Sequence, residues 1–73
     1  MIIYNDLEPY RIGTVYRFGQ EPIACYDYRA ILEHYQRDGM TEEEAVEYFE
    51  YNVIGAWVGD TTPCFLDTHA SVV

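Results

Sequence analysis

Apolar residues recur at helical spacing in the middle of the chain, between residues 27 and 39. Four of them fall at i, i+3, i+4 and i+7 and so share one helix face: Tyr28, Ile31, Leu32 and Tyr35. Asp27 precedes this stretch, where its carboxylate can accept hydrogen bonds from the free N–H groups of the first turn. Gly39 follows it and supplies the left-handed backbone that commonly ends a helix. The pattern therefore predicts a first helix that is capped by Asp27 and ends before Gly39.

A second apolar stripe begins directly after a strong helix-start signal. Thr41 and Glu44 fit the capping box, in which the hydroxyl and the carboxylate each accept from the other residue's backbone N–H. Four residues then form one apolar face: Ala45, Val46, Phe49 and Val53. We expect a second helix from Thr41 onward. Because the connection at Gly39 and Met40 is so short, the two helices should form an antiparallel hairpin.

Short runs of β-favouring residues lie on both sides of the helix pair. Residues 2–4, 12–18 and 23–25 contain such runs, and proline and glycine residues separate them. After a predicted turn at 59–63, residues 64–66 form one more run, which could pair with residues 22–25 or with an N-terminal strand. Trp57 is expected to fill the core, and residues 68–73 are expected to fray. The predicted fold is α+β: one domain over residues 1–73, with the αα-hairpin packed on a small sheet of two to four short strands.

Charge adds a second kind of information. Thirteen acidic residues face four arginines and no lysine, so the formal net charge is -9. The resulting field repels nucleic acid and anionic lipid, and it favours a basic protein surface as the partner. Direct binding to DNA or RNA is therefore excluded as a function class. The alternative interpretation is that the acidic residues only keep the protein soluble.

The glutamates of the second helix fall into two groups. Glu42, Glu43 and Glu44 lie in its first turn, where the helix dipole favours each negative charge by about 0.3–1 kcal/mol. Helix initiation does not account for Glu47 and Glu50, which share a face with Glu43 at i, i+4 and i+7. Like charges at i, i+4 cost about 0.2–0.5 kcal/mol per pair. No lysine or arginine follows Arg37, so this half of the chain cannot neutralise them.

The few arginines are predicted to be engaged elsewhere. Arg29 and Arg37 each stand four residues from Glu33, and these spacings predict two local ion pairs on the first helix. The unopposed carboxylates of the second helix recur with each helical turn, about every 5–6 Å. This spacing resembles that of the phosphates along a nucleic-acid strand. The predicted partner-binding residues are Asp38, Glu43, Glu47, Glu50, Tyr51 and Asp60.

The sequence gives little support to metal binding or catalysis. Cys25, His34, Cys64 and His69 lack the closely paired spacing of structural zinc sites, so no metal and no cofactor is expected. Both cysteines lie in apolar runs that predict inert, reduced thiols, and no glycine-rich phosphate loop occurs. We therefore expect no enzyme. No apolar run has the length of a membrane span and no signal sequence is visible, so the host cytosol is the expected compartment.

Part of the sequence resembles a set of small proteins of phages and mobile elements. Residues 37–66, RDGMTEEEAVEYFEYNVIGAWVGDTTPCFL, match its recurring pattern: an RDG-(M)-T-x-E-E-A start, an aromatic-Asn-x-x-Gly middle and a T-P-x-F end. Most members have no assigned function, so the resemblance implies a phage-like origin only. By its size, charge and implied origin, the chain is also similar to anti-CRISPR proteins, several of which mimic DNA.

Two function classes follow for this chain. The first is an anti-CRISPR type inhibitor that blocks a DNA-binding groove of a host CRISPR effector complex by acidic mimicry of DNA. The second is a structural or regulatory interaction module, such as a homodimer or a phage assembly subunit, with an exposed apolar patch at residues 53–58. A metal protein or enzyme is a third and minor alternative, which elemental analysis would detect.

Overall fold

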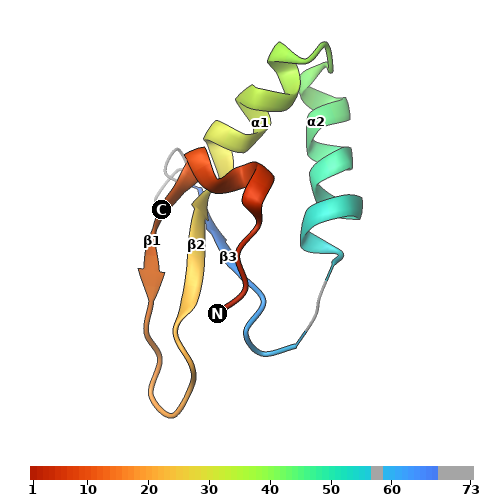
Figure 1. The fold of residues 1–73 in the computed structure, drawn as a ribbon. Helices are drawn as coiled ribbons and strands as arrows, with labels where there is room; N and C mark the ends of the chain where they lie inside the picture. The colour runs from red at the N-terminus through yellow and green to blue at the C-terminus, as the bar shows by residue number, and fades with distance from the viewer. Residues whose placement is uncertain (57–58, 68–73) are drawn as a thin grey trace, which may run out of the picture.

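Two main helices and a three-stranded sheet dominate the part of the chain that the computed structural model describes, residues 1–56 and 59–67. The elements follow in the order η1 (Asn5–Tyr10), β1 (Arg11–Val15), β2 (Ile23–Asp27), α1 (Tyr28–Arg37), α2 (Glu42–Phe49), η2 (Glu50–Ile54) and β3 (Cys64–Leu66). The helix pair stands at one end of the sheet, and the β1–β2 turn extends from the other end (Figure 1). The predicted α+β class is therefore confirmed.

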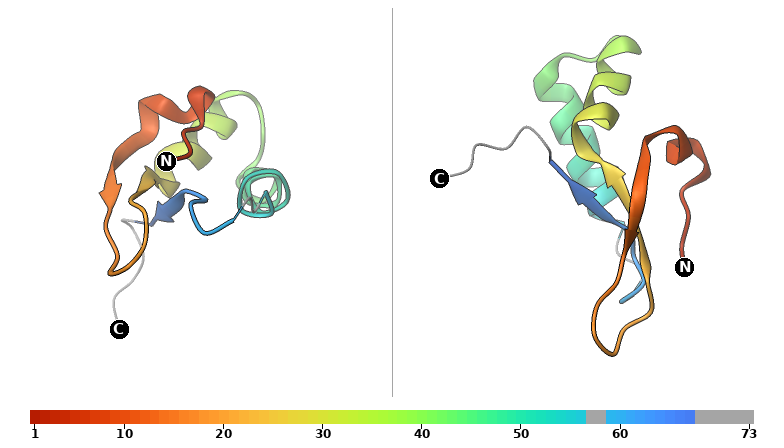
Figure 2. Two further views of the ribbon diagram at one scale, coloured as in Figure 1. Left: turned by 60° about the horizontal axis from the view of Figure 1, so that its bottom comes forward. Right: turned by 90° about the vertical axis from the view of Figure 1, so that its left-hand side faces the viewer.

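The sheet is mixed, with β2 as its central strand. β1 pairs antiparallel with β2, and β3 pairs parallel with β2 so that Cys25 lies opposite Cys64. The run at 64–66 therefore forms the predicted strand and pairs with β2, not with an N-terminal strand. The paired residues of β2 are 25–27, of which only Cys25 lies within the expected partner segment 22–25. An irregularity between Arg11 and Gly13 interrupts the β1–β2 register. Bulges of this kind increase the local twist, and Figure 2 shows how far the hairpin turns away from the helices.

The N-terminal region differs from the expected strands. Residues 2–4 form no strand, and the chain continues into the 3-10 helix η1. The backbone N–H of Tyr4 donates to the Tyr26 hydroxyl at 2.8 Å, and the two rings stack with their centroids 5.8 Å apart. Tertiary packing on Tyr26 thus replaces strand pairing here. The expected run at 12–18 is shorter than predicted, because β1 ends at Val15.

Both helix starts form as the sequence predicts. The Asp27 carboxylate accepts a hydrogen bond from the Ala30 N–H at 3.2 Å, and Gly39 adopts φ 109° after α1. At α2, the Thr41 N–H donates to the Glu44 carboxylate at 2.9 Å, and the Glu44 N–H donates to the Thr41 hydroxyl at 3.2 Å. η2 continues α2 as a π-helical turn that the sequence pattern does not predict.

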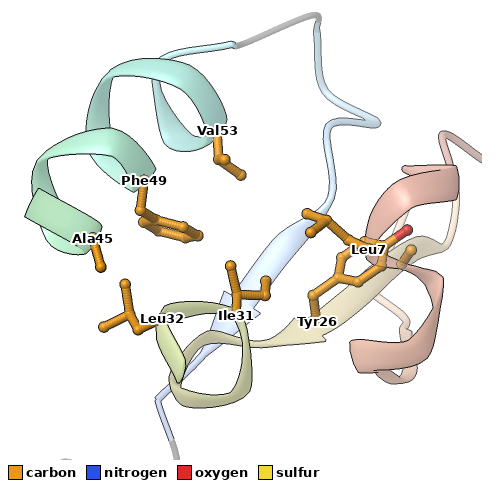
Figure 3. Close-up of a cluster of buried hydrophobic side chains, with 8 residues drawn as sticks. Leu7, Tyr26, Ile31, Leu32, Ala45, Phe49 and Val53 are labelled. Atoms are coloured by element: carbon orange, nitrogen blue, oxygen red, sulfur yellow. The ribbon is translucent and has the colours of Figure 1, made fainter. Parts of the chain in front are cut away.

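The core lies between the helix pair, β2 and η1 (Figure 3). Its largest fully buried side chains are Tyr26, Phe49 and Ile31. The Phe49 ring makes edge contacts with the rings of Tyr28 and Phe65, each at a centroid distance of 4.9 Å. These contacts hold α2 against α1 and β3. The predicted core role of Trp57 and the expected fraying of residues 68–73 lie outside the described residues.

Candidate partner-binding surface

The carboxylates of α2 and η2 form a surface that points away from the core. Ala45 and Phe49 are completely buried, whereas Glu43, Glu47 and Glu50 are all exposed. We call these three glutamates the acidic face. The capping box and the aromatic contacts of Phe49 fix the helix on which they stand. The acidic face is therefore presented by a rigid element and not by a loop.

No cation compensates the acidic face in the part of the chain that the structure describes. The ion pairs there join the N-terminal amine to Glu21, Arg11 to Glu8, and Arg29 to Asp67, with His34 near Asp38. Each of them lies outside α2 and η2. The glutamates therefore repel one another without relief from neighbouring side chains, as the sequence predicts.

The two local ion pairs predicted on α1 are wrong. The Arg29 Nε donates to the Asp67 carboxylate at 3.2 Å, because the end of β3 lies beside the first turn of α1. The Arg37 guanidinium donates instead to the Tyr10 hydroxyl at 3.3 Å. Within residues 1–56 and 59–67, no ion pair reaches Glu33. This exposed carboxylate therefore adds to the negative surface of the helix pair.

Asp38 lies at the tip of the helix hairpin, where α1 ends. Its side chain is exposed, and its Oδ2 is 3.5 Å from Nε2 of His34. This contact becomes an ion pair only when the imidazole is protonated. The exposed Asp38 carboxylate extends the negative surface beyond the start of α2.

Asp60 lies far from Asp38. The turn at 59–63 and the helix connection at 38–41 are at opposite ends of the molecule (Figure 1). The Arg17 guanidinium donates to the Asp60 backbone carbonyl at 3.0 Å, so a cation lies beside this residue. The structure thus groups Glu43, Glu47 and Glu50, with Asp38 beyond them, and sets Asp60 apart.

Two shallow hollows flank the acidic face. Val46 contributes the apolar part of the first, between Glu43 and Glu47. The second is lined by residues from the helix connection, α2 and η2: Met40, Glu44, Glu47, Tyr48, Tyr51 and Asn52. Tyr51 is 81 % exposed at this site, and π-helical turns such as η2 are frequent at functional sites. Tyr51, a predicted partner contact, therefore lies beside apolar side chains as well as beside the glutamates.

An exposed aromatic pair on the β1–β2 turn is absent from the predicted site. Tyr16 is 78 % and Phe18 104 % exposed, because β1 ends before them and the chain turns at Gly19. The sequence pattern assigns both residues to a strand, so it does not predict that they are exposed. The apolar patch expected at 53–58 is only partly described: Val53 is buried, Ile54 is exposed, and residues 57 and 58 lie outside the described ranges.

Comparison of the chain with protein-family models, curated proteins and solved structures finds no match. Function must therefore be inferred from the surface itself. Among the described residues, His, Cys, Asp and Glu side chains form no group of three that could hold a metal ion. None of the described helices combines the length and apolarity that crossing a bilayer requires.

Proposed function

We propose that this chain is a phage-derived inhibitory binding protein of the anti-CRISPR type. Its acidic face would occupy a basic, DNA-binding groove of a host CRISPR effector complex and act stoichiometrically, without a cofactor. The observation that supports this proposal is the exposed, uncompensated set of Glu43, Glu47 and Glu50 on a capped and packed helix. A groove lined with lysine and arginine offers these carboxylates the cations that the chain itself lacks.

The physical argument is electrostatic. A basic groove holds mobile anions or DNA, and an acidic rod that replaces them releases small ions from both surfaces. Binding should therefore weaken steeply as the salt concentration rises, as it does for DNA. The negative field also accelerates encounter with a basic surface. Binding to cations relieves the repulsion among the glutamates, and this relief adds to the free energy of binding.

Apolar contacts beside the charges would set the lifetime of the complex. Tyr51 and Tyr48 line one hollow and Val46 lines the other, all next to Glu47. Tyrosines at the centre of an interface often carry a large share of the binding energy. Changes in such contacts act mainly on the dissociation rate. The glutamates and the tyrosines of α2 and η2 are thus expected to act on different kinetic constants.

The proposal predicts a selective effect of charge reversal. We expect Glu47→Lys combined with Glu50→Lys to weaken competition with duplex DNA for the effector complex at least about 100-fold, with the fold retained. The matched control is Asp6→Lys with Glu21→Lys, which changes the net charge equally at exposed positions outside α2 and η2. The measurement is DNA displacement at several salt concentrations, and circular dichroism checks the fold.

The control decides between site-specific and general electrostatics. We expect it to stay within about fivefold of the unmodified chain, because it changes the overall field and removes only an exposed ion pair, that of Glu21 with the N-terminal amine. If the α2–η2 variant displaces DNA as well as the unmodified chain, the mimic proposal is wrong. If both variants lose activity equally, net charge and not the acidic face is responsible. Capture of partners from a bacterial lysate at low and high salt would identify the effector.

A second candidate is supported by the exposed pair Tyr16 and Phe18. A structural or regulatory interaction module would use this apolar turn to form a homodimer or a phage assembly. It predicts a mass by light scattering that rises with concentration and returns to the monomer value in Phe18→Ser. The Glu47→Lys/Glu50→Lys variant should then self-associate normally. A monomer at all concentrations would remove the homodimer.

A further inference from the structure

The two cysteines meet on neighbouring strands. Cys25 lies on β2 directly opposite Cys64 on β3, in a parallel register. Neighbouring strands lie about 4.7–4.9 Å apart, which is within the range of Cα separations that a disulfide spans. The side chains of directly opposed residues point to the same face of a sheet. Cys25 and Cys64 are therefore neighbours on one face of the sheet.

The two thiols lie on the sheet face opposite the aromatic core. Tyr26 and Phe65, which follow them in β2 and β3, pack against each other in a tilted arrangement at the core, with a ring centroid distance of 6.0 Å. Successive strand residues alternate between faces, so Cys25 and Cys64 point the other way. Joining them would leave the packing of Tyr26 and Phe65 in place.

A reagent can reach this pair from the edge of the sheet. Cys64 is partly exposed, whereas Cys25 is buried. Gly13 pairs with Cys25 from the other side and has no side chain, and the space where its Cβ would stand is open. Across the sheet, Gly13 on β1 therefore leaves open space, Cys25 on β2 is buried, and Cys64 on β3 is the more accessible thiol. Cys64 is the thiol that meets a reagent first.

We propose that Cys25 and Cys64 form a modification site, a dithiol that reacts with small-molecule disulfides and closes into a Cys25–Cys64 bond in the folded chain. The bond would enclose residues 26–63, which hold nine carboxylates but only two arginines. It would thus act as a clamp around the most negatively charged part of the protein. This inference stands apart from the proposed function, since it does not depend on any partner.

The reaction is a two-step exchange with a disulfide such as oxidised glutathione as the oxidant. The Cys64 thiolate attacks one glutathione sulfur, forms a mixed disulfide and releases one glutathione thiolate. Cys25 loses its proton and attacks the Cys64 sulfur, which forms the internal bond and releases the second glutathione thiolate. The two cysteine thiols lose two electrons in total, and oxidised glutathione gains them.

The buried thiol should limit the rate of closure. Burial, with a further contribution from the neighbouring Cys64, raises the pKa of the Cys25 thiol to about 11. At neutral pH, Cys25 is therefore almost entirely protonated and attacks slowly. The fixed position of Cys25 beside Cys64 offsets part of this loss. Closure should accelerate as the pH rises towards 10.

The experiment measures closure in the folded and the unfolded chain. The reduced protein is equilibrated with mixtures of oxidised and reduced glutathione, with and without urea, and free thiols are then trapped with N-ethylmaleimide. Intact mass should show an internal disulfide, with two hydrogens lost, at an oxidised-to-reduced ratio at least about tenfold lower in the folded chain than in urea. Cys25→Ser and Cys64→Ser should each stop at the glutathione adduct.

Three results would overturn the site. They are two trapped thiols at every glutathione ratio, a stable mixed disulfide on the unmodified chain, or closure that is no more favourable when folded than in urea. The stabilisation that the internal disulfide provides is measured separately by thermal unfolding. Because a closed loop of this length restricts the unfolded chain, we expect the oxidised protein to melt at least about 10 °C above the reduced one. An oxidised chain that melts at the same temperature or lower would refute the clamp.

Discussion

At the scale of single residues, the hydroxyl groups of the partly buried Tyr4 and the fully buried Tyr26 have opposite effects on stability. The Tyr26 hydroxyl accepts the Tyr4 backbone N–H, while the Tyr4 hydroxyl is buried with no hydrogen-bond partner among the described residues. Burial raises the pKa of Tyr4, as expected for a phenol removed from water. The Tyr26 hydroxyl thus pairs with a backbone N–H and stabilises the fold, whereas the buried Tyr4 hydroxyl lowers its stability.

Removing each hydroxyl should therefore have opposite consequences. We expect Tyr26→Phe to lower the free energy of unfolding by about 1–3 kcal/mol, because it leaves the Tyr4 N–H unsatisfied. Tyr4→Phe should leave stability unchanged or raise it by up to about 1 kcal/mol. Urea unfolding followed by fluorescence measures both. Equal losses in the two variants would show that the Tyr4 hydroxyl has a partner after all.

At the scale of elements, the α1–α2 hairpin is the part of the fold that local sequence signals predict most completely. Its caps, its glycine stop and its apolar stripes are all local, and all appear as the sequence predicts. The first turn of α2 carries three glutamates, of which Glu44 closes the capping box. The acidic face of the proposed site therefore depends on the same local signals that start the helix.

The capping box provides a test of this dependence. We expect Thr41→Ala to lower the free energy of unfolding by about 0.5–2 kcal/mol, because the Glu44 N–H loses the hydroxyl that accepts its hydrogen bond. Thr41→Ser keeps the hydroxyl and should stay close to the unmodified chain. Chemical unfolding measures both, and an equal loss in Thr41→Ser would assign the effect to the threonine methyl group.

At the scale of the whole molecule, charge is distributed unevenly. Residues 11–20 contain two arginines and no acid, whereas α2 and η2 contain five glutamates and no cation. The β1–β2 turn and the helix hairpin lie at opposite ends (Figure 2). One end therefore offers carboxylates to a basic groove, and the other offers exposed apolar side chains, so a partner can distinguish the two ends.

The sequence alone determined most features that depend on neighbours within about four residues, with the exception of the two i, i+4 ion pairs expected on α1 and the π-helical turn η2. The two helix starts, the stop at Gly39, the acidic face and the short strand at 64–66 belong here, because caps and side-chain periodicity act locally. Of the candidate site, the sequence identified the stripe of Glu43, Glu47 and Glu50 and its exposure. It also identified the α+β class.

Only the tertiary structure decided which distant residues meet. Arg29 pairs with Asp67 and not with Glu33, and Arg17 reaches the Asp60 carbonyl, since the packing of β3 and the course of the turns bring them together. Strand register placed Cys25 opposite Cys64. The end of β1 left Phe18 exposed. Such contacts depend on how the elements dock, because cross-strand register and long-range ion pairs leave no local spacing signal in the sequence.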